Sequence, residues 1–356
     1  MYFSLTDEQR ALQATVRDFL GDRFPLSAVR AVYDDEPGDG RPSDGDPAEL
    51  WKAIGEQGWL AVMISEEHDG LGLGLLDAAV LARCWGEGCV PGPFLPTLVA
   101  AEAIRLGGSP EQQDEWLPKV AAGEVRLALA THGKVTASGE KLSGTVPYVE
   151  YAHVADRILV AADAGTIWIV DPADQGVGVT VRDTLDRSTR ICSLELDGVT
   201  GAALPGHVLP DVGARAAVLA ANDLAGIARV ALSRTIDYDK TREQFGKPVG
   251  SFQALKHALA DLHVAVTMAE HAGWYAAHAL DAGLPDAALA VSVAKAKASD
   301  AARDATAAMI QFHGGIGYTW EHDAHLFFKR AKRLEYAYGD AAAHRERIAR
   351  LVVDGS

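Results

Sequence analysis

The sequence predicts an α+β protein in which two helical regions lie before and after a short β-rich region. Apolar residues recur at helical spacing over residues 5–122 and again after residue 212. Over residues 126–209 the apolar residues instead alternate with polar ones or form short runs between Gly and Asp turns. We therefore expect three domains: an N-terminal helical domain (1–124), a middle β domain (125–210) and a C-terminal helix bundle (211–356).

The N-terminal region opens with a helix-start signal. Thr6 and Gln9 have the spacing of a capping box ahead of an amphipathic helix that runs to about Phe24. Residues 34–46 are rich in Gly, Pro and Asp and predict a loop. The other helices expected in this region cover residues 48–57, 75–85, 96–106 and 110–121.

The middle region contains short segments with strand-like patterns. The segments are RLALATH, RILVAA, TIWIVD, GVTV and SLELDGV. Their spacing predicts a small antiparallel barrel or sandwich.

The C-terminal region reads as a bundle of five helices. Its long helices are expected at 212–240, 254–282 and 286–310. Two connectors join them, TREQFGKPVGSFQ at 241–253 and QFHGGIG at 311–317.

Both connectors have the composition of an anion site. The first places an arginine, an aromatic residue and a Gly–Lys–Pro turn at a helix end, where an anionic group is well held. The second is rich in glycine, so its backbone N–H groups can approach a diphosphate closely. No strand precedes the second connector, which excludes a Rossmann dinucleotide motif. On these residues alone, a solvated helix hairpin is the alternative interpretation of the first connector.

Composition limits the classes of function and location. The chain has 356 residues, 48% of them hydrophobic, and a formal net charge of −16, which opposes non-specific binding to nucleic acid. Its three cysteines have no metal-ligand spacing, and their odd number argues against a disulfide framework. There is no signal sequence at the N-terminus and no run of eighteen apolar residues. We expect a cytoplasmic protein that binds neither membrane, nucleic acid nor metal.

The two connectors, about sixty residues apart, and the following YTWEHDAHLFFKRAK resemble the acyl-CoA dehydrogenase family. The resemblance covers about residues 5–352 and is closest to the actinobacterial branch that degrades sterol side chains with mixed-subunit pairs. It implies the family's three-part fold, FAD as cofactor, and oxidation of an acyl-CoA to the 2,3-enoyl-CoA. It also implies an electron-transfer flavoprotein as electron acceptor and a heterotetramer with a homologous subunit.

In the family, the two connectors hold the adenosine-diphosphate half of the FAD of a partner subunit. By this resemblance Arg242 would pair with the pyrophosphate, which suits the planar fork of a guanidinium group. The other matching positions, which would line or complete the cofactor cradle, are Gln244, Phe245, Gln253, Gln311, Gly314, Gly315 and Gly317. Gln253 has a second interpretation, because a glutamine at a helix start is often only a cap.

The middle region departs from the family at the flavin ring. Residues 131–133 are Thr-His-Gly where relatives have Thr-Glu-Pro, and residues 148–150 are Tyr-Val-Glu where relatives have Trp-Ile-Thr. The carboxylate of Glu150 would repel the negative charge of reduced flavin. We infer that the flavin-ring site of this chain is impaired or absent.

The family's reaction needs a carboxylate that removes the proton alpha to the thioester, with a pKa raised by burial. Relatives place it at one of three positions, which are here Gly339, Ala216 and Asp223. Asp223 is therefore the candidate catalytic base. Alternatively, it pairs with Arg229 or another buried cation, or caps a break near Gly226.

Other charged residues near the C-terminus have plainer interpretations. Asp340 predicts an N-cap for a final helix that starts at residue 341. His322 and His325 are three apart on an expected helix, but no further ligands join them, so we expect packing at an interface or substrate edge. The basic run at 329–333 predicts a helix face that meets CoA phosphates, acidic neighbours or solvent.

Two further hypotheses remain open. One is a self-sufficient homo-oligomeric dehydrogenase that uses Asp223 as its base and still holds flavin. The other is a scaffold subunit that stabilises a partner and binds no cofactor.

Overall fold

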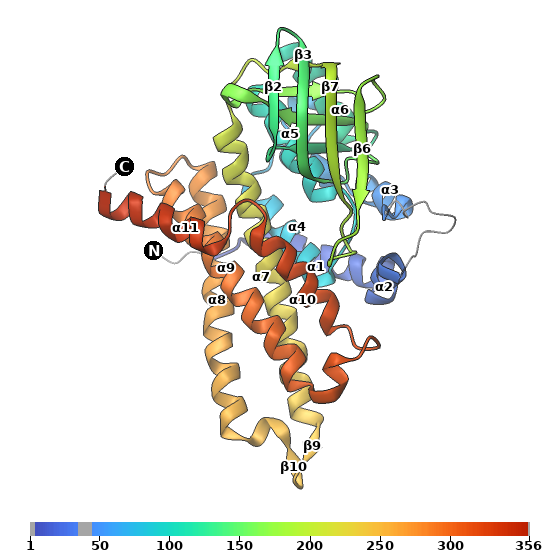
Figure 1. Cartoon of the computed structure of the whole chain (residues 1–356). Helices are drawn as coiled ribbons and strands as arrows, with labels where there is room; N and C mark the ends of the chain where they lie inside the picture. The colour runs from blue at the N-terminus through green and yellow to red at the C-terminus, as the bar shows by residue number, and fades with distance from the viewer. Residues whose placement is uncertain (1–3, 35–44, 355–356) are drawn as a thin grey trace. The chain divides into compact units, whose positions relative to one another are not determined.

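The computed structural model describes residues 4–34 and 45–354, without the side chains of residues 164 and 354 (Figure 1). The predicted loop at 34–46 therefore lies almost entirely outside the described residues. The helices are α1 (Asp7–Arg23), α2 (Leu26–Asp34), α3 (Ala48–Glu56), α4 (Leu75–Gly88), α5 (Phe94–Gly107), α6 (Pro110–Ala121), α7 (Leu209–Thr241), α8 (Gln253–Asp281), α9 (Ala287–Phe312), α10 (Ala324–Tyr336) and α11 (Ala341–Ala349).

The chain forms two compact units. The first comprises residues 1–26, 75–90 and 214–356, and the second comprises residues 27–74 and 91–213. The predicted N-terminal helical region is thus divided, with α1 and α4 in the first unit and α2, α3, α5 and α6 in the second. The division into three domains stays a prediction.

The second unit contains two four-stranded sheets, which confirms the predicted α+β class. Their orders are β1-β4-β5-β8 and β2-β3-β7-β6. The strands are β1 (Leu127–Ala130), β2 (Lys134–Ser138), β3 (Lys141–Glu150), β4 (Arg157–Ala161), β5 (Ile167–Val170), β6 (Val177–Arg182), β7 (Ile191–Thr200) and β8 (Ala202–Ala203). Buried apolar side chains from both sheets, among them Ile158, Val160, Val146 and Leu194, share one hydrophobic core.

All strand pairs in these two sheets are antiparallel except β1 and β4, which are parallel. The sequence analysis missed β2 and β3 because their segments are rich in Ser, Thr and Gly and expose every second residue or more. It also missed α2, whose two buried residues, Val29 and Tyr33, leave a weak helical pattern.

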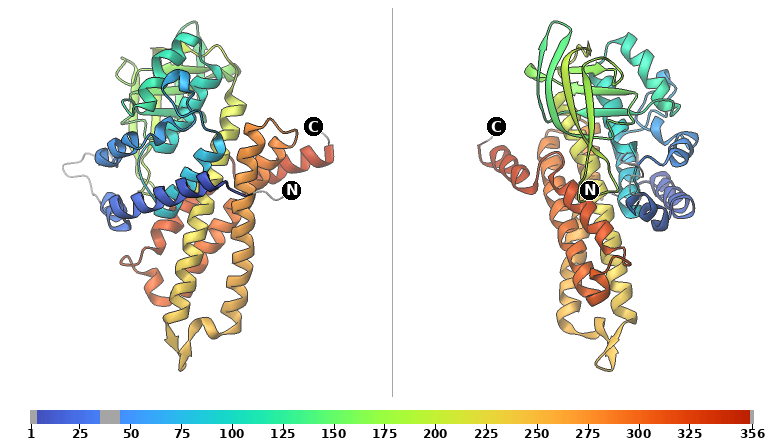
Figure 2. Two further views of the ribbon diagram at one scale, coloured as in Figure 1. Left: turned by 180° about the vertical axis from the view of Figure 1, so that it is seen from behind. Right: turned by 45° about the vertical axis from the view of Figure 1, so that its right-hand side comes forward.

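The first unit is a helix bundle in which α7, α8 and α9 run alongside one another (Figure 2). Helices α4 and α7 touch backbone to backbone. A Cβ added at Gly86 would lie 2.0 Å from the carbonyl oxygen of Asp223, and one at Gly226 would lie 2.1 Å from that of Arg83. Both positions therefore require glycine.

The capping signals in the sequence were correct. Thr6 and Gln9 form a capping box at the start of α1, and the side chain of Asp340 accepts a hydrogen bond from the backbone of Ala343 at the start of α11. Among the described residues, α7 alone is long and apolar enough to cross a membrane, but 83% of its most apolar window is buried. It has the character of a core helix.

Candidate functional site

The first connector forms a small hairpin at one end of the bundle (Figure 1). Strand β9 (Glu243–Gln244) pairs with β10 (Lys247–Pro248), and a 3₁₀ turn (Val249–Ser251) leads into α8. Phe245 and Gly246 at the hairpin turn have φ angles of 55° and 77°. Two successive positive φ angles are typical of a type I′ turn, and Gly246 meets this requirement without strain.

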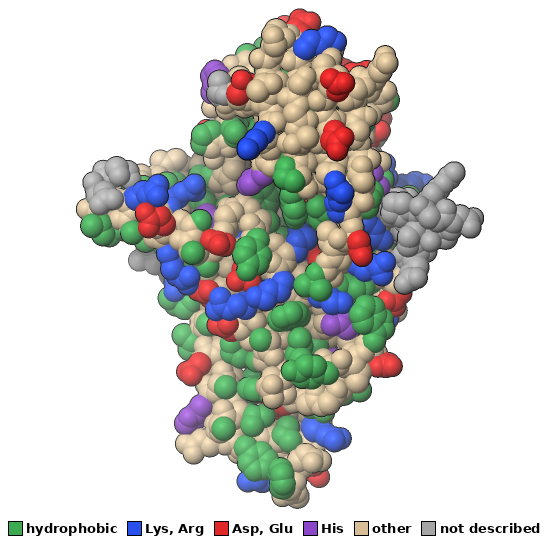
Figure 3. Space-filling view, viewed as in Figure 1, with side chains coloured by type: hydrophobic (Ala, Val, Ile, Leu, Met, Phe, Trp, Pro, Cys, Tyr) green, Lys and Arg blue, Asp and Glu red, His purple; other side chains and the backbone are tan. Residues whose placement is uncertain are grey.

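Phe245, at the turn of the hairpin, is the most exposed large hydrophobic residue in the described part of the chain. It is 91% exposed, and its ring meets that of Phe252 edge-on, with ring centroids 6.1 Å apart. The ammonium group of Lys247 lies 4.3 Å from the centre of the Phe252 ring. Figure 3 shows hydrophobic and basic side chains together at this end. Such a mixture favours contact with another molecule.

Arg242 has an anchored backbone and a free side chain. Its N–H donates to the carbonyl of Tyr238 at 2.8 Å, and its own carbonyl accepts from Val249 at 2.8 Å. Its guanidinium group is exposed and has no hydrogen-bond or ion-pair partner in the described part of the chain. The fold therefore presents an available cation with five donors.

The second connector, with a 3₁₀ turn over Gly314–Tyr318, uses its glycines in different ways. Gly314 has a φ of +64°, and a Cβ at Gly317 would lie 2.4 Å from the carbonyl oxygen of Ile310. Both residues are therefore required by the fold. Gly315 has an ordinary φ, and a Cβ there would meet no atom within 4 Å. Its lack of a side chain leaves an open surface.

A stack of rings joins the bases of the two connectors. Tyr238, one turn before Arg242, packs on His313 with centroids 4.3 Å apart and donates its hydroxyl to the His313 carbonyl at 3.3 Å. The ring of His322 also contacts the ring of His313, with ring centroids 4.4 Å apart. Burial lowers the pKa of both histidines below the ordinary range, which keeps the stack neutral near pH 7.

The remaining predicted cofactor residues are exposed. Gln244 donates only to the adjacent carbonyl of Glu243, at 2.9 Å, and the Gln253 amide lies 3.4 Å from a ring nitrogen of His257. Gln253 begins α8 but does not cap it. Gln311 is exposed in the last turn of α9. The structure thus places the predicted cradle residues on two connectors of one unit, joined through Tyr238 and His313. Sequence reasoning missed this pair, although Tyr238 stands one helical turn before Arg242.

Asp223 is fully buried and paired with Arg330. The guanidinium group of Arg330 makes two contacts with the carboxylate, at 3.1 and 2.6 Å, and a third with the carbonyl of Val90 at 2.9 Å. The carboxylate raises the pKa of Arg330 further above its ordinary value, against the effect of burial. This geometry matches the alternative of a buried cation partner. The catalytic role of Asp223 stays a prediction, with this ion pair against it.

Arg229, the partner first considered for Asp223, instead contacts Glu270 at 2.5 Å. Arg83 binds the same carboxylate at 2.6 Å. This cluster links α4, α7 and α8. Asp223 is therefore not part of it.

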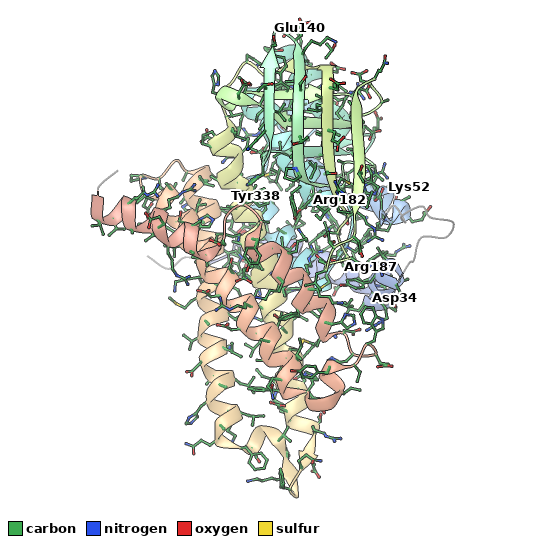
Figure 4. All side chains as sticks on the ribbon, viewed as in Figure 1. Asp34, Lys52, Glu140, Arg182, Arg187 and Tyr338 are labelled. Carbon is green, nitrogen blue, oxygen red and sulfur yellow. The ribbon has the colours of Figure 1, made fainter. Side chains whose placement is uncertain are left out.

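The turn after α10 contains Tyr338, which is labelled in Figure 4, and Gly339, one of the three positions considered above for the catalytic base. Here Gly339 has a φ of +96°, and a Cβ there would lie 3.1 Å from His344. The buried ammonium group of Lys295 donates to the carbonyl of Gly339 at 2.9 Å, and His344 lies 3.1 Å from the carbonyl of Tyr338. Burial lowers the pKa of Lys295 to about 8. The turn is held rigidly and presents no carboxylate at the glycine.

Two interpretations of the C-terminal charges were wrong. His322 precedes α10 and accepts the N–H of Ala324 at 3.2 Å, so it does not share a helix with His325. Arg330 does not lie on an exposed basic face, because its side chain points into the core toward Asp223. Lys329 is half-buried, and its ammonium group lies 4.5 Å from the centre of the Trp320 ring.

In the second unit, the side chain of Glu150 occupies the end of β3. Its carboxylate accepts a hydrogen bond from the hydroxyl of Tyr148 at 3.1 Å. Before it, the pairing of β3 with β7 is irregular between Val146 and Val149, which marks a bulge. The expectation that this region holds a flavin ring poorly stays a prediction.

Comparison with known proteins gives a consistent result. The profile of "Acyl-CoA dehydrogenase, N-terminal domain" matches residues 6–124, and that of "Acyl-CoA dehydrogenase, C-terminal domain" matches residues 214–353. The chain is 35% identical over 328 residues to acyl-CoA dehydrogenase IpdE2 of Mycobacterium tuberculosis, with 91% of each chain covered. It is 34% identical to the IpdE2 of Mycolicibacterium smegmatis, with 98% of each covered.

Solved structures agree. A variant of the Tcur3481-Tcur3483 steroid ACAD is similar with a TM-score of 0.89 and 31% identity, covering 98% of each chain. The ChsE4-ChsE5 complex from Mycobacterium tuberculosis is similar with a TM-score of 0.90 and 27% identity, covering 99% of each chain.

Proposed function

Since the chain belongs to the acyl-CoA dehydrogenase family, we propose that it is one subunit of an FAD-dependent oxidoreductase that converts an acyl-CoA to the 2,3-enoyl-CoA. In this proposal the chain supplies the adenosine-diphosphate half of a flavin site to a homologous partner. The partner carries the flavin ring and the catalytic base. The observation that carries the proposal is the free, exposed guanidinium group of Arg242 beside the exposed Phe245.

The residues of the two connectors fit the diphosphate. Arg242 would hold phosphate oxygens bidentately, and the open surface at Gly315 would let the backbone approach them. Phe245 and the glutamines would line the cofactor from the hairpin. Bound flavin would supply the hydride acceptor for the oxidation. Because both connectors face outward, the site they form is suited to a cofactor shared with a second chain.

The environment of the candidate bases supports assigning the base to the partner. Asp223 would have to leave a buried bidentate ion pair before it could act as a base, and breaking this pair would leave the charge of Arg330 buried and uncompensated. Gly339 offers no carboxylate at the other position. These two observations disfavour the self-sufficient enzyme.

The similar structures support the type of assembly and substrate. Two of them are described as pairs of different subunits, and one of these is described as a steroid enzyme. We infer a heterotetramer that acts on a steroid-derived acyl-CoA and passes electrons to an electron-transfer flavoprotein.

The test is the flavin content of the co-expressed complex with Arg242→Ala. We expect the dissociation constant for FAD to rise about 10- to 100-fold, because a charged hydrogen bond contributes about 1.5–3 kcal/mol. Lys240→Ala, an exposed cation two residues earlier, is the matched control and should retain flavin. If Arg242→Ala leaves flavin content and turnover intact, the chain is a scaffold.

A further inference from the structure

Asp239 is a buried carboxylate with no partner, at the base of the first connector. It lies on the last turns of α7 and is 1% exposed. Both of its carboxylate oxygens are buried without a hydrogen-bond partner in the described residues, and so is the hydroxyl oxygen of Ser251. A buried carboxylate without hydrogen bonds costs several kcal/mol when ionised. The fold therefore tolerates the neutral acid here better than the charged form.

The connector itself covers this group. A Cβ added at Gly250 would lie 2.8 Å from the carbonyl oxygen of Asp239 and 3.2 Å from its Cβ. The turn that leads into α8 thus packs on Asp239 with no side chain between them. Any change in the charge of Asp239 acts directly on the segment that carries Arg242.

Surrounding charges do not compensate the carboxylate. Tyr238, the residue before Asp239, is half-buried and hydrogen-bonded to His313. The charged groups of the last turn of α7, the hairpin and the start of α8 are exposed: Asp237, Lys240, Arg242, Glu243, Lys247, Lys256 and His257. Burial alone raises the pKa of Asp239 to about 6. At neutral pH the unbound connector therefore holds a carboxylate close to its titration range.

We propose that the half-site binds the flavin diphosphate together with one proton, and that Asp239 is the group that takes up this proton. The inference rests on the proposed function, because it concerns the diphosphate held by Arg242. Arg242 follows Asp239 by three residues, just beyond the end of α7, and its carbonyl accepts a hydrogen bond from Val249 in the turn that packs on Asp239. A diphosphate brought to Arg242 adds negative charge near Asp239 and favours its neutral form.

Two other titratable groups lie at this end of the bundle. His313 and His322 have lowered pKa values, so they gain protons only below the ordinary range of histidine. Their protonation would also favour a diphosphate. Only a substitution of Asp239 separates its effect from theirs.

The experiment is a titration of the flavin-free complex with FAD, followed by flavin fluorescence from pH 5.5 to 7.5. For the wild type we expect the dissociation constant to rise at least about tenfold over this range, since each proton taken up changes affinity up to tenfold per pH unit. Asp239→Asn, which has the same shape and no charge, should bind with little pH dependence. Asp237→Asn removes an exposed carboxylate two residues earlier and should retain the wild-type slope.

A second measurement needs no variant. Calorimetric titration of the wild-type complex with FAD in buffers of different ionisation enthalpy should report uptake of about one proton near pH 6.5. A result of no proton uptake, or an unchanged slope in Asp239→Asn, would overturn the inference. If flavin binds in an Arg242-dependent way without proton linkage, only the role of Asp239 fails. If binding does not depend on Arg242, the proposed function itself fails.

Discussion

Two arginines of the helix bundle have opposite environments. Arg330, on α10, is buried, binds both oxygens of Asp223 and caps the carbonyl of Val90. Arg242, at the end of α7, is exposed and has no partner for its guanidinium group in the part of the chain that the structure describes. The charge of Arg330 is compensated by Asp223 inside the protein. The charge of Arg242 is available to bind a ligand or a partner protein.

The comparison separates structural from functional charge without reference to the reaction. A buried ion pair is costly to break, because removing one partner leaves the other uncompensated. An exposed, unpaired arginine adds little to stability, so its presence beside an exposed aromatic residue needs another explanation. By the same criterion Asp223 resembles Arg330, and Asp239 is an exception: it is buried, yet unpaired.

The largest loss of folding stability is expected when the buried ion pair of Asp223 and Arg330 is broken. Asp223→Ala should lower the free energy of unfolding by about 3–5 kcal/mol, because it leaves the charge of Arg330 buried and unpaired. Urea denaturation of the isolated chain measures this. The double variant Asp223→Leu with Arg330→Met should recover most of the loss. Should Asp223→Asn leave stability intact but abolish turnover of the complex, Asp223 is the base after all.

The next largest expected effect is a pH-dependent loss of stability caused by the ionisation of Asp239. Since the pKa of Asp239 is about 6 when folded and 3.8 ordinarily, the folded state binds the proton more tightly. The folded state therefore loses stability as pH rises from about 4 to 6, and the full penalty, at most about 3 kcal/mol, holds above 6. Unfolding of the wild type and Asp239→Asn should agree at pH 4 and diverge in favour of the variant by pH 7.5. Parallel pH profiles would contradict this.

Arg242→Ala should leave the free energy of unfolding within about 0.5 kcal/mol of the wild type, because the side chain has no partner to lose. Thermal denaturation of the lone chain would check this against Arg330→Ala, which should be strongly destabilised. A large loss of stability in Arg242→Ala would remove the distinction between the two arginines.

Two neighbouring glycines of the second connector should respond differently to substitution. Gly314→Ala should cost about 1 kcal/mol, because alanine is strained at a φ of +64°. Gly315→Ala should be nearly neutral for stability but weaken flavin binding by the complex, because its methyl group would stand on the open surface. Unchanged flavin binding in Gly315→Ala would show that the connector does not contact the cofactor at this position.

Much of this fold could be predicted from periodicity. Long helices such as α8 have an apolar repeat, and a capping box marks the start of α1. Strand β3 could not be found in this way, because its exposed face is polar and its bulge breaks the alternation. Helix α2 has only two buried residues to mark it.

The candidate site was predictable only where residues are consecutive. Arg242 and Phe245 stand in one motif, so the sequence indicated them directly. The partner of Asp223 is 107 residues away, and a basic run gave no sign that Arg330 alone turns inward. The burial of Asp239 without a hydrogen-bond partner depends on the residues that pack around it, so no local sequence pattern could indicate it. The stack of Tyr238 on His313 likewise joins distant segments.

The central claim is that this chain lends half of a flavin site to another subunit. The visible absorption spectrum of the protein expressed alone, and again with its homologous partner, tests it most directly by giving the flavin content per chain. The account predicts a colourless lone chain and about one flavin per pair of subunits in the complex. If the protein expressed alone carried about one flavin per chain, the account would be contradicted and the chain would be a self-sufficient dehydrogenase.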